Sequence, residues 1–125
     1  MSKQSIAIVG LGRVGSVFLA ELLRRPNKDI EVVAVAEKNE TSGKILAKSQ
    51  GIAVLDIDAL IAMGEKIDIL FDLTGMPAIR RELREKLSDA SNRHTIIATE
   101  TIAKLIWSLV ASEVALPGVH DKTGY

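Results

Sequence analysis

Three glycines near the N-terminus have the spacing of a phosphate-binding turn. Gly10, Gly12 and Gly15 form the pattern G-x-G-x-x-G in the stretch GLGRVG, directly after the apolar run IAIV. Gly10 would permit a tight turn, Gly12 would let the backbone approach a pyrophosphate, and Gly15 would let the next helix pack closely on the strand. The backbone amides from Leu11 to Val14 would then lie at a helix N-terminus, where an anion is stabilised.

An acidic residue follows where a dinucleotide requires one. Glu37 ends the run EVVAVAE, roughly 20 residues after the glycines, where a carboxylate accepts hydrogen bonds from the adenosine ribose hydroxyls. Its charge would repel a phosphate on that ribose, so we expect NAD rather than NADP. Lys38 and the more distant Arg13 keep NADP as the alternative, since either cation could pair with the extra phosphate.

A later apolar run ends in DLTG, which supplies the rest of the candidate site. A ligand of an open α/β sheet lies beyond the carboxyl ends of the strands, so we expect Thr74 and Gly75 to border the cofactor. Asp72 is expected either to point into the sheet or to cap the next turn. The predicted cofactor-binding residues are Gly10, Leu11, Gly12, Arg13, Val14, Gly15, Glu37, Lys38, Thr74 and Gly75.

Neither histidine is assigned a catalytic role. His94 precedes a predicted strand and should therefore lie at the edge of the sheet opposite the cofactor, on the surface. His120 lies in the segment ALPGVHDKTGY, whose composition is typical of a frayed end. The two histidines and the scattered acids have no metal-ligand spacing, so neither a catalytic residue nor a metal site is predicted.

Two other interpretations of the glycines compete with the dinucleotide site. A structural α/β domain can contain such a turn and bind nothing, and methyltransferases have a related loop with glycines at alternate positions. Val14 stands where a methyltransferase loop would have its third glycine. The position of GLGRVG between a strand and a helix, together with Glu37, favours the dinucleotide site.

The elements that must position these residues alternate between short β-branched runs and helix-like segments, which is typical of a parallel sheet covered on both faces. We expect a doubly wound, mostly parallel α/β/α sheet of about five strands. One dinucleotide-binding domain would span residues 1–115, followed by a flexible tail at 116–125. The expected strands are 5–9, 31–36, 52–55, 66–73 and 94–99, and the expected helices are 13–24, 42–50, 57–64, 78–87 and 100–114.

Composition excludes several classes of partner. The 16 basic and 16 acidic residues cancel, so no overall field attracts nucleic acid or an anionic membrane. Only 3% of residues are aromatic, which disfavours base stacking. The chain has no cysteine, which permits a reducing compartment, and its N-terminal apolar run is too short for a signal sequence or a membrane span. We expect a cytoplasmic protein.

The motifs resemble the NAD(P)-binding Rossmann superfamily from IAIVGLGRVG, which begins at residue 6, to HTIIATETIA, which ends at residue 103. Their order is similar to the N-terminal domains of the glucose-fructose oxidoreductase and homoserine dehydrogenase groups. This resemblance implies hydride transfer between a nicotinamide and a substrate. Glu100, Thr101 and Ile102 depart from the glutamate-lysine-proline element of the first group, and we expect no substrate domain to follow.

The last predicted helix, ETIAKLIWSLVASE, is similar to the end of nucleotide-binding modules fused ahead of bacterial signalling domains. We expect its apolar face to cover the sheet edge as core. Trp107 lies off this face and, if exposed, would anchor a homodimer or a partner domain. The apolar face comprises Ile102, Leu105, Ile106, Leu109 and Val110.

Three functions remain open at this point. The favoured one is an NAD(H)-binding module with a sensory or regulatory role, in which occupancy or cofactor redox state changes an interface. An NAD(P)-dependent oxidoreductase completed by another chain is the alternative. The third is a structural α/β domain with an empty glycine loop.

Overall fold

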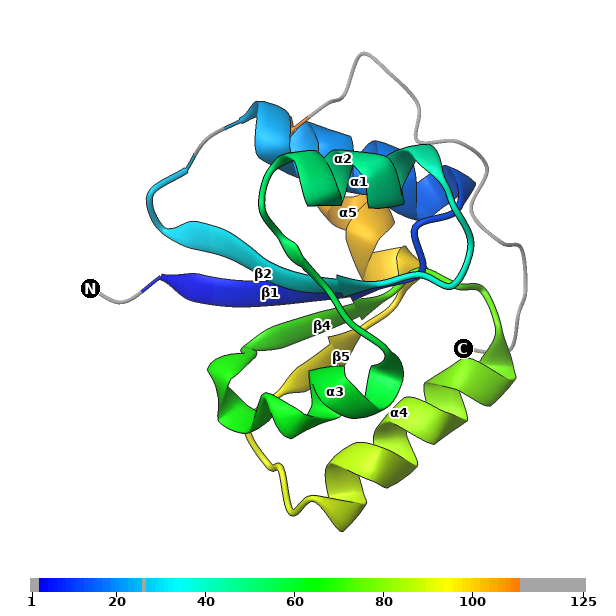
Figure 1. Ribbon diagram of the computed structural model, residues 1–125. Helices are drawn as coiled ribbons and strands as arrows, with labels where there is room; N and C mark the ends of the chain where they lie inside the picture. The colour runs from blue at the N-terminus through cyan, green and yellow to red at the C-terminus, as the bar shows by residue number, and fades with distance from the viewer. Residues whose placement is uncertain (1–2, 26, 111–125) are drawn as a thin grey trace.

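Five parallel strands in the order β3-β2-β1-β4-β5 form the central sheet of the computed structural model, which describes residues 3–25 and 27–110 (Figure 1). This arrangement confirms the predicted doubly wound sheet. The direction of winding changes between β1 and β4, which is where open α/β sheets bind ligands. The strands are β1 (Gln4–Val9), β2 (Ile30–Ala36), β3 (Ala53–Val54), β4 (Ile69–Asp72) and β5 (Ile96–Ala98).

Helices cover both faces of this sheet (Figure 1). One layer contains α1 (Arg13–Arg24), α2 (Ser42–Ser49) and α5 (Glu100–Val110), and the other contains α3 (Ile57–Ala62) and α4 (Pro77–Asp89), with a 3-10 turn at Gly64–Lys66. Two helices have side-chain N-caps: Thr41 Oγ1 accepts from the Lys44 amide at 3.1 Å before α2, and Asp56 Oδ1 accepts from the Ala59 amide at 2.7 Å before α3.

The core divides into two clusters because alternate residues of a strand face opposite sides of the sheet. Ile6 and Ile8 of β1 pack in the cluster under α1, α2 and α5, whereas Ala7 and Val9 pack in the cluster under α3 and α4. Burial on both faces explains why β1 is a continuous apolar run. In the first cluster, the rings of Phe18 and Phe71 lie 5.0 Å apart at an angle of 54°.

Strands β4 and β5 are shorter than predicted, since polar side chains stop each of them at its N-terminal end. The 3-10 turn occupies residues up to Lys66, and Asp68 uses its carboxylate in a contact described below. Before β5, the Asn92 side chain accepts hydrogen bonds from the amides of His94 and Thr95 at 2.9 and 3.0 Å. His94 and Thr95 therefore lie in a turn, although Thr95 is β-branched and also suits a strand.

The orientation of α5 differs from the prediction. Trp107 is 6% exposed and packs with Ala103 in the core, so it is not available as a surface anchor. Ile102 and Leu105, which were expected in the core, are 44% and 58% exposed. The prediction assigned the larger apolar stripe to the sheet, but the sheet accommodates Trp107 beside the small Ala103 instead.

Part of the predicted organisation lies outside the described residues. The end of the last helix beyond Val110 and the tail at 116–125 belong to this part. Within residues 3–25 and 27–110, no helix combines the length and the apolar character that crossing a membrane requires.

Candidate functional site

The carboxyl ends of three strands meet at one level of the sheet. Val9 at the end of β1 is in register with Ala36 of β2 on one side and with Asp72 of β4 on the other. The loops that follow these strands begin with Gly10, Glu37 and Leu73. The sheet therefore brings the glycine loop, the predicted ribose acid and the DLTG segment to one edge.

Two of the three glycines are required by close backbone approach. Gly10 has a φ of +96°, and a Cβ there would lie 2.8 Å from Thr74 Cγ2 and 2.9 Å from the Thr74 amide nitrogen. A Cβ at Gly15 would lie 1.9 Å from the carbonyl oxygen of Gly10. The loop can thus fold back on α1 only because neither position carries a side chain.

Gly12 differs from its neighbours because a Cβ built on it would meet nothing within 4 Å. It is the N-cap of α1, makes no side-chain capping hydrogen bond, and is followed by no acidic residue in the first turn. The first turn of a helix attracts anions through its amides and its dipole. The space over Gly12 is therefore suited to a phosphate group that lies directly against the backbone.

Glu37 lies beside this space and is fixed by two backbone amides. Its Oε1 accepts from the Leu11 amide at 2.7 Å, and its Oε2 accepts from the Asn39 amide at 2.9 Å. The Leu11 amide, which we expected to face an anion, is therefore directed at Glu37. The contact joins the glycine loop to the end of β2 and leaves the carboxylate with further acceptor capacity toward a ligand.

Asp72 and Thr74 shape the third loop. Asp72 is fully buried, and its Oδ1 accepts from the Thr74 amide at 3.1 Å and from the Thr74 hydroxyl at 2.7 Å. Asp72 therefore caps the turn after β4, which was one of its two expected roles. Gly75 follows with a φ of +68°. This turn holds Thr74 against Gly10, on the same edge as the glycine loop.

The remaining predicted residues contribute in different ways. Leu11 and Val14 are buried in the core, so only their backbone atoms can contact a ligand. Arg13 and Lys38 are exposed, at the start of α1 and after the end of β2. Exposed cations at these two positions are compatible with the predicted interaction with an additional phosphate.

Ser16 is a positioning residue that the sequence analysis did not identify. Its hydroxyl donates to the Leu11 carbonyl at 2.7 Å and accepts from the Gly43 amide at 2.9 Å, so it links the glycine loop to the start of α2. A Cβ at Gly43 would lie 2.4 Å from this hydroxyl oxygen. The available signal was a pair of small residues, one directly after the third glycine and the other in the first turn of a helix.

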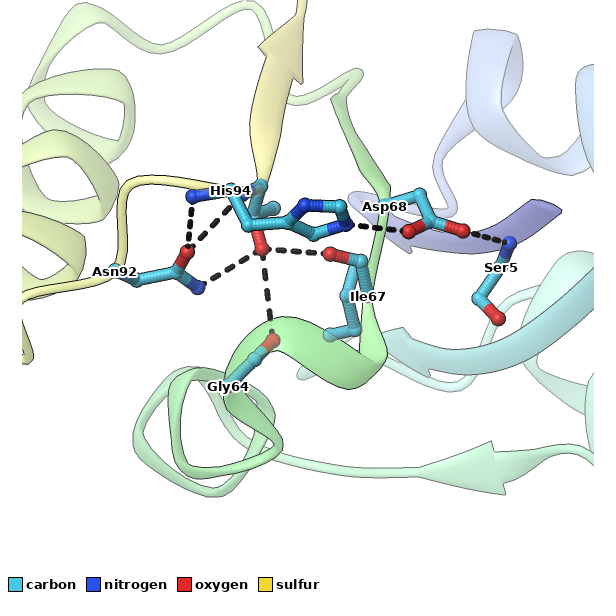
Figure 2. Close-up of polar contacts among 7 residues, drawn as sticks. Ser5, Gly64, Ile67, Asp68, Asn92 and His94 are labelled. Carbon is cyan, nitrogen blue, oxygen red and sulfur yellow. Dashed lines mark hydrogen bonds and ion pairs between the residues drawn. The ribbon is translucent and has the colours of Figure 1, made fainter.

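A polar cluster occupies the opposite edge of the sheet, where His94 was expected (Figure 2). His94 Nε2 lies 2.5 Å from Asp68 Oδ1, and Asp68 Oδ2 accepts from the Ser5 amide at 2.8 Å. The cluster thus joins the start of β1 to the segments before β4 and β5. Because it lies at the amino ends of the strands, it belongs to the framework of the sheet and not to the candidate cofactor site.

The Asp68 contact predicts a pH dependence of stability. The hydrogen bond with His94 and that from the Ser5 amide hold the pKa of the Asp68 carboxyl below its ordinary value. Its stabilisation is therefore complete above the unfolded-state pKa of about 3.9 and is lost as the pH falls through the lower folded-state pKa. We expect Asp68→Asn to lower the melting temperature near neutral pH and the difference from wild type to shrink below about pH 4.

Thermal melting over this pH range, with Asp29→Asn at an exposed position as the control, tests the prediction. The control should show no such convergence with wild type. A wild-type to Asp68→Asn difference that stays constant down to about pH 2 would contradict the assigned role of Asp68.

Comparison with solved structures finds the same fold in larger proteins. A homoserine dehydrogenase from S. aureus matches with a TM-score of 0.59 and 20% identity over 89% of this chain and 30% of its own. GenD2 from gentamicin A biosynthesis, in complex with NAD, matches with a TM-score of 0.58 and 19% identity over 90% of this chain and 32% of its own. Saccharopine dehydrogenase (L-Glu forming) from Saccharomyces cerevisiae matches with a TM-score of 0.57 and 21% identity over 77% of this chain and 21% of its own. The chain thus spans a third or less of these three proteins.

Sequence comparison is more specific. No curated protein sequence matches the chain. The family model described as "Homoserine dehydrogenase, NAD binding domain" matches residues 10–98, which include the glycine loop, Glu37 and the DLTG turn. This match covers more than half of the 125 residues. The chain therefore belongs to the family of homoserine dehydrogenase NAD-binding domains.

Proposed function

We propose that this Rossmann domain binds NAD(H) across the carboxyl ends of β1, β2 and β4 and serves as the cofactor-binding part of an oxidoreductase. The open space over Gly12 carries the proposal, because it is the position where a side chain would obstruct a pyrophosphate. When NAD(H) is bound, its nicotinamide would supply hydride transfer. Residues outside 3–110, or another chain, would supply the substrate pocket, in keeping with the chain spanning 30% of the S. aureus homoserine dehydrogenase.

Different residues of the site would contact different parts of the cofactor. The first turn of α1 would stabilise the pyrophosphate through its backbone amides and dipole. Glu37 would accept hydrogen bonds from the adenosine ribose while retaining the Leu11 and Asn39 amides. Thr74 and Gly75 would border the cofactor from the end of β4. A carboxylate at the ribose disfavours NADP, so we propose NAD(H) as the physiological ligand.

Replacing Glu37 tests this assignment. Glu37→Ala removes charged hydrogen bonds worth about 1.5–3 kcal/mol, so we expect NAD affinity to fall roughly tenfold or more. NADP affinity should fall less, because the variant also removes a repulsive charge. Glu37→Gln keeps an acceptor for a loop amide but removes the charge. It should therefore also lower the affinity for NAD relative to that for NADP. Titration calorimetry with both cofactors measures these affinities.

Glu31→Gln is the matched control, since Glu31 is exposed at the other end of the same strand, about 20 Å away. It removes the same charge and should leave the ratio of the NAD and NADP dissociation constants unchanged. An equal loss of affinity for NAD and NADP in both Glu37 variants would remove Glu37 from the ribose role.

A regulatory NAD(H)-binding role is the second candidate. It is favoured by Thr101 and Ile102, which stand where the glucose-fructose oxidoreductase group has the lysine and proline of its fifth-strand element. A regulatory domain should couple the cofactor to an interface, so NAD or NADH would change its self-association or partner binding. A cofactor-binding part of an enzyme needs no such coupling. Sedimentation with and without NADH distinguishes the two roles.

A further inference from the structure

The first three amides of the glycine loop differ in what accepts them. The Gly10 amide donates to the Ala36 carbonyl at 2.9 Å, and the Leu11 amide donates to Glu37 Oε1 at 2.7 Å. In the part of the chain that the structure describes, no carbonyl or side chain accepts the Gly12 amide. An amide at a helix N-terminus is otherwise satisfied by water or by a ligand. Gly12 therefore supplies an amide of this loop that a ligand can use.

The Ser16 hydroxyl fixes the direction of this amide. It donates to the Leu11 carbonyl at 2.7 Å, and that carbonyl belongs to the same peptide group as the Gly12 N–H. The peptide group is planar and trans, so its carbonyl and its N–H point in opposite directions. Because Ser16 lies in the first turn of α1, its hydroxyl holds the carbonyl toward the helix. The Gly12 N–H therefore points away from the helix, beyond its N-terminus.

A contact with α2 holds the hydroxyl itself in place. Ser16 Oγ accepts from the Gly43 amide at 2.9 Å, so the single hydrogen of the hydroxyl is left for the Leu11 carbonyl. A Cβ at Gly43 would lie 2.4 Å from Ser16 Oγ and 2.9 Å from Ser16 Cα, so the two helices approach closely at this point. The packing of α2 on α1 thus orients the hydroxyl before any ligand binds.

We infer that Ser16 is a positioning residue for the pyrophosphate, an inference that rests on the proposed NAD(H) binding. Its hydroxyl directs the Gly12 amide into the open space over that glycine, where the amide donates to a phosphate oxygen. A hydrogen bond to a charged oxygen is stronger than one between neutral groups. A donor that is already oriented also spares the complex the cost of ordering it. Ser16 acts through the peptide group between Leu11 and Gly12 and does not itself contact the cofactor.

Ser16→Ala tests this role with ligands that share adenosine but differ in the pyrophosphate. We expect the variant to bind NAD and ADP-ribose about tenfold more weakly than wild type, because one hydrogen bond to a charged group is impaired. Adenosine lacks the pyrophosphate, so its affinity should stay within a factor of about two of wild type. Titration calorimetry measures NAD and ADP-ribose, and NMR titration measures the weaker adenosine.

Ser49→Ala is the matched control. The Ser49 hydroxyl also donates to a backbone carbonyl at 2.7 Å, that of Leu46, but it lies at the other end of α2 from Gly43. This variant should bind all three ligands as wild type does. The melting temperatures of both variants without ligand show whether they are folded.

The Gly12 amide gives a second readout that does not depend on affinity. Its NMR signal should differ between wild type and Ser16→Ala without ligand, because the peptide group loses its fixed direction. In wild type the same signal should shift with ADP-ribose and much less with adenosine. An unchanged Gly12 signal in Ser16→Ala would show that the hydroxyl does not orient this amide, and would overturn the inference.

The ligand series separates this inference from the proposed function. An equal loss of affinity for adenosine and ADP-ribose in Ser16→Ala would mean that Ser16 only supports the fold. Wild-type affinity for all three ligands in Ser16→Ala would overturn the inference and leave the proposed NAD(H) binding intact. A wild-type protein that binds neither NAD nor ADP-ribose at millimolar concentration would contradict the proposed function, and this inference with it.

Discussion

Gly12→Val is expected to abolish NAD(H) binding while leaving the protein folded. In the structure a Cβ at this position meets no atom within 4 Å, so the larger side chain has room without the cofactor. With the cofactor, valine would occupy the place of the pyrophosphate at the start of α1. We expect the dissociation constant for NAD to rise at least about 100-fold, equivalent to about 2.7 kcal/mol. Calorimetric titration gives the affinity, and thermal melting without ligand gives the stability.

Gly12→Ala places a smaller side chain, a single methyl group, in the space proposed for the pyrophosphate. It should weaken NAD binding less than valine does and should lower the melting temperature of the free protein only slightly, because alanine is a poorer N-cap than glycine. Retention of wild-type NAD affinity in Gly12→Val would mean that the pyrophosphate does not lie over this residue. A large loss of stability in Gly12→Val would show instead that the space over Gly12 is not open.

Gly15→Ala should differ from Gly12→Val, because its main effect should be a large loss of stability of the free protein. A Cβ at Gly15 would lie 1.9 Å from the Gly10 carbonyl oxygen, and this is backbone that cannot rotate away. Alanine gains up to about 1 kcal/mol of helix propensity over glycine, but overpacking against backbone costs about 3 kcal/mol or more, so the clash dominates. We expect the melting temperature of the free protein to fall by roughly 5–10 °C.

Comparison of Gly15→Ala with Gly12→Ala is informative because both add one methyl group within the same loop. The first should lower stability, and the second should lower cofactor affinity. If Gly15→Ala melted at the wild-type temperature, the close approach of the loop to α1 would be wrong, and with it the geometry of the site.

Much of the fold could be predicted because local signals and burial agree. The strand-glycine-helix unit at residues 4–24 combines an apolar run, a turn that needs glycine and a helix with one apolar side. Thr41 and Asp56 are residue types favoured at helix N-caps, and each lies directly before a helix. The ends of β4 and β5 were harder to predict, since the Asn92 turn includes Thr95, a β-branched residue that also suits a strand.

The candidate site was predictable in its residue types but not in its internal contacts. The positions of Gly10, Glu37 and Thr74 after apolar runs were enough to predict that all three lie at the carboxyl ends of strands. The hydrogen bond from Leu11 to Glu37 and the Ser16 link to α2 depend on how separate segments meet in space, and no local pattern encodes them. A sequence can show that an amide lies in a loop without showing which acceptor it faces.

Helix α5 shows how tertiary packing can override a periodic pattern. The apolar stripe through Leu105 is longer than the inner side formed by Ala103 and Trp107, so periodicity favoured the wrong side. One large aromatic ring beside a small residue fills the space over β4 and β5. Ile102, Leu105 and Leu109 of this stripe remain exposed, whereas Ile106 packs partly against the core.

The most direct test of the account is thermal melting of the purified chain with NAD, NADH, NADP and NADPH in turn. A ligand that binds only the folded state raises the melting temperature, and at 100 times its dissociation constant it adds about 2.7 kcal/mol of stability. We predict that NAD and NADH raise the melting temperature of wild type, that NADP and NADPH raise it less, and that none raises it in Gly12→Val. No shift of wild type with any of the four at millimolar concentration would contradict the NAD(H) site.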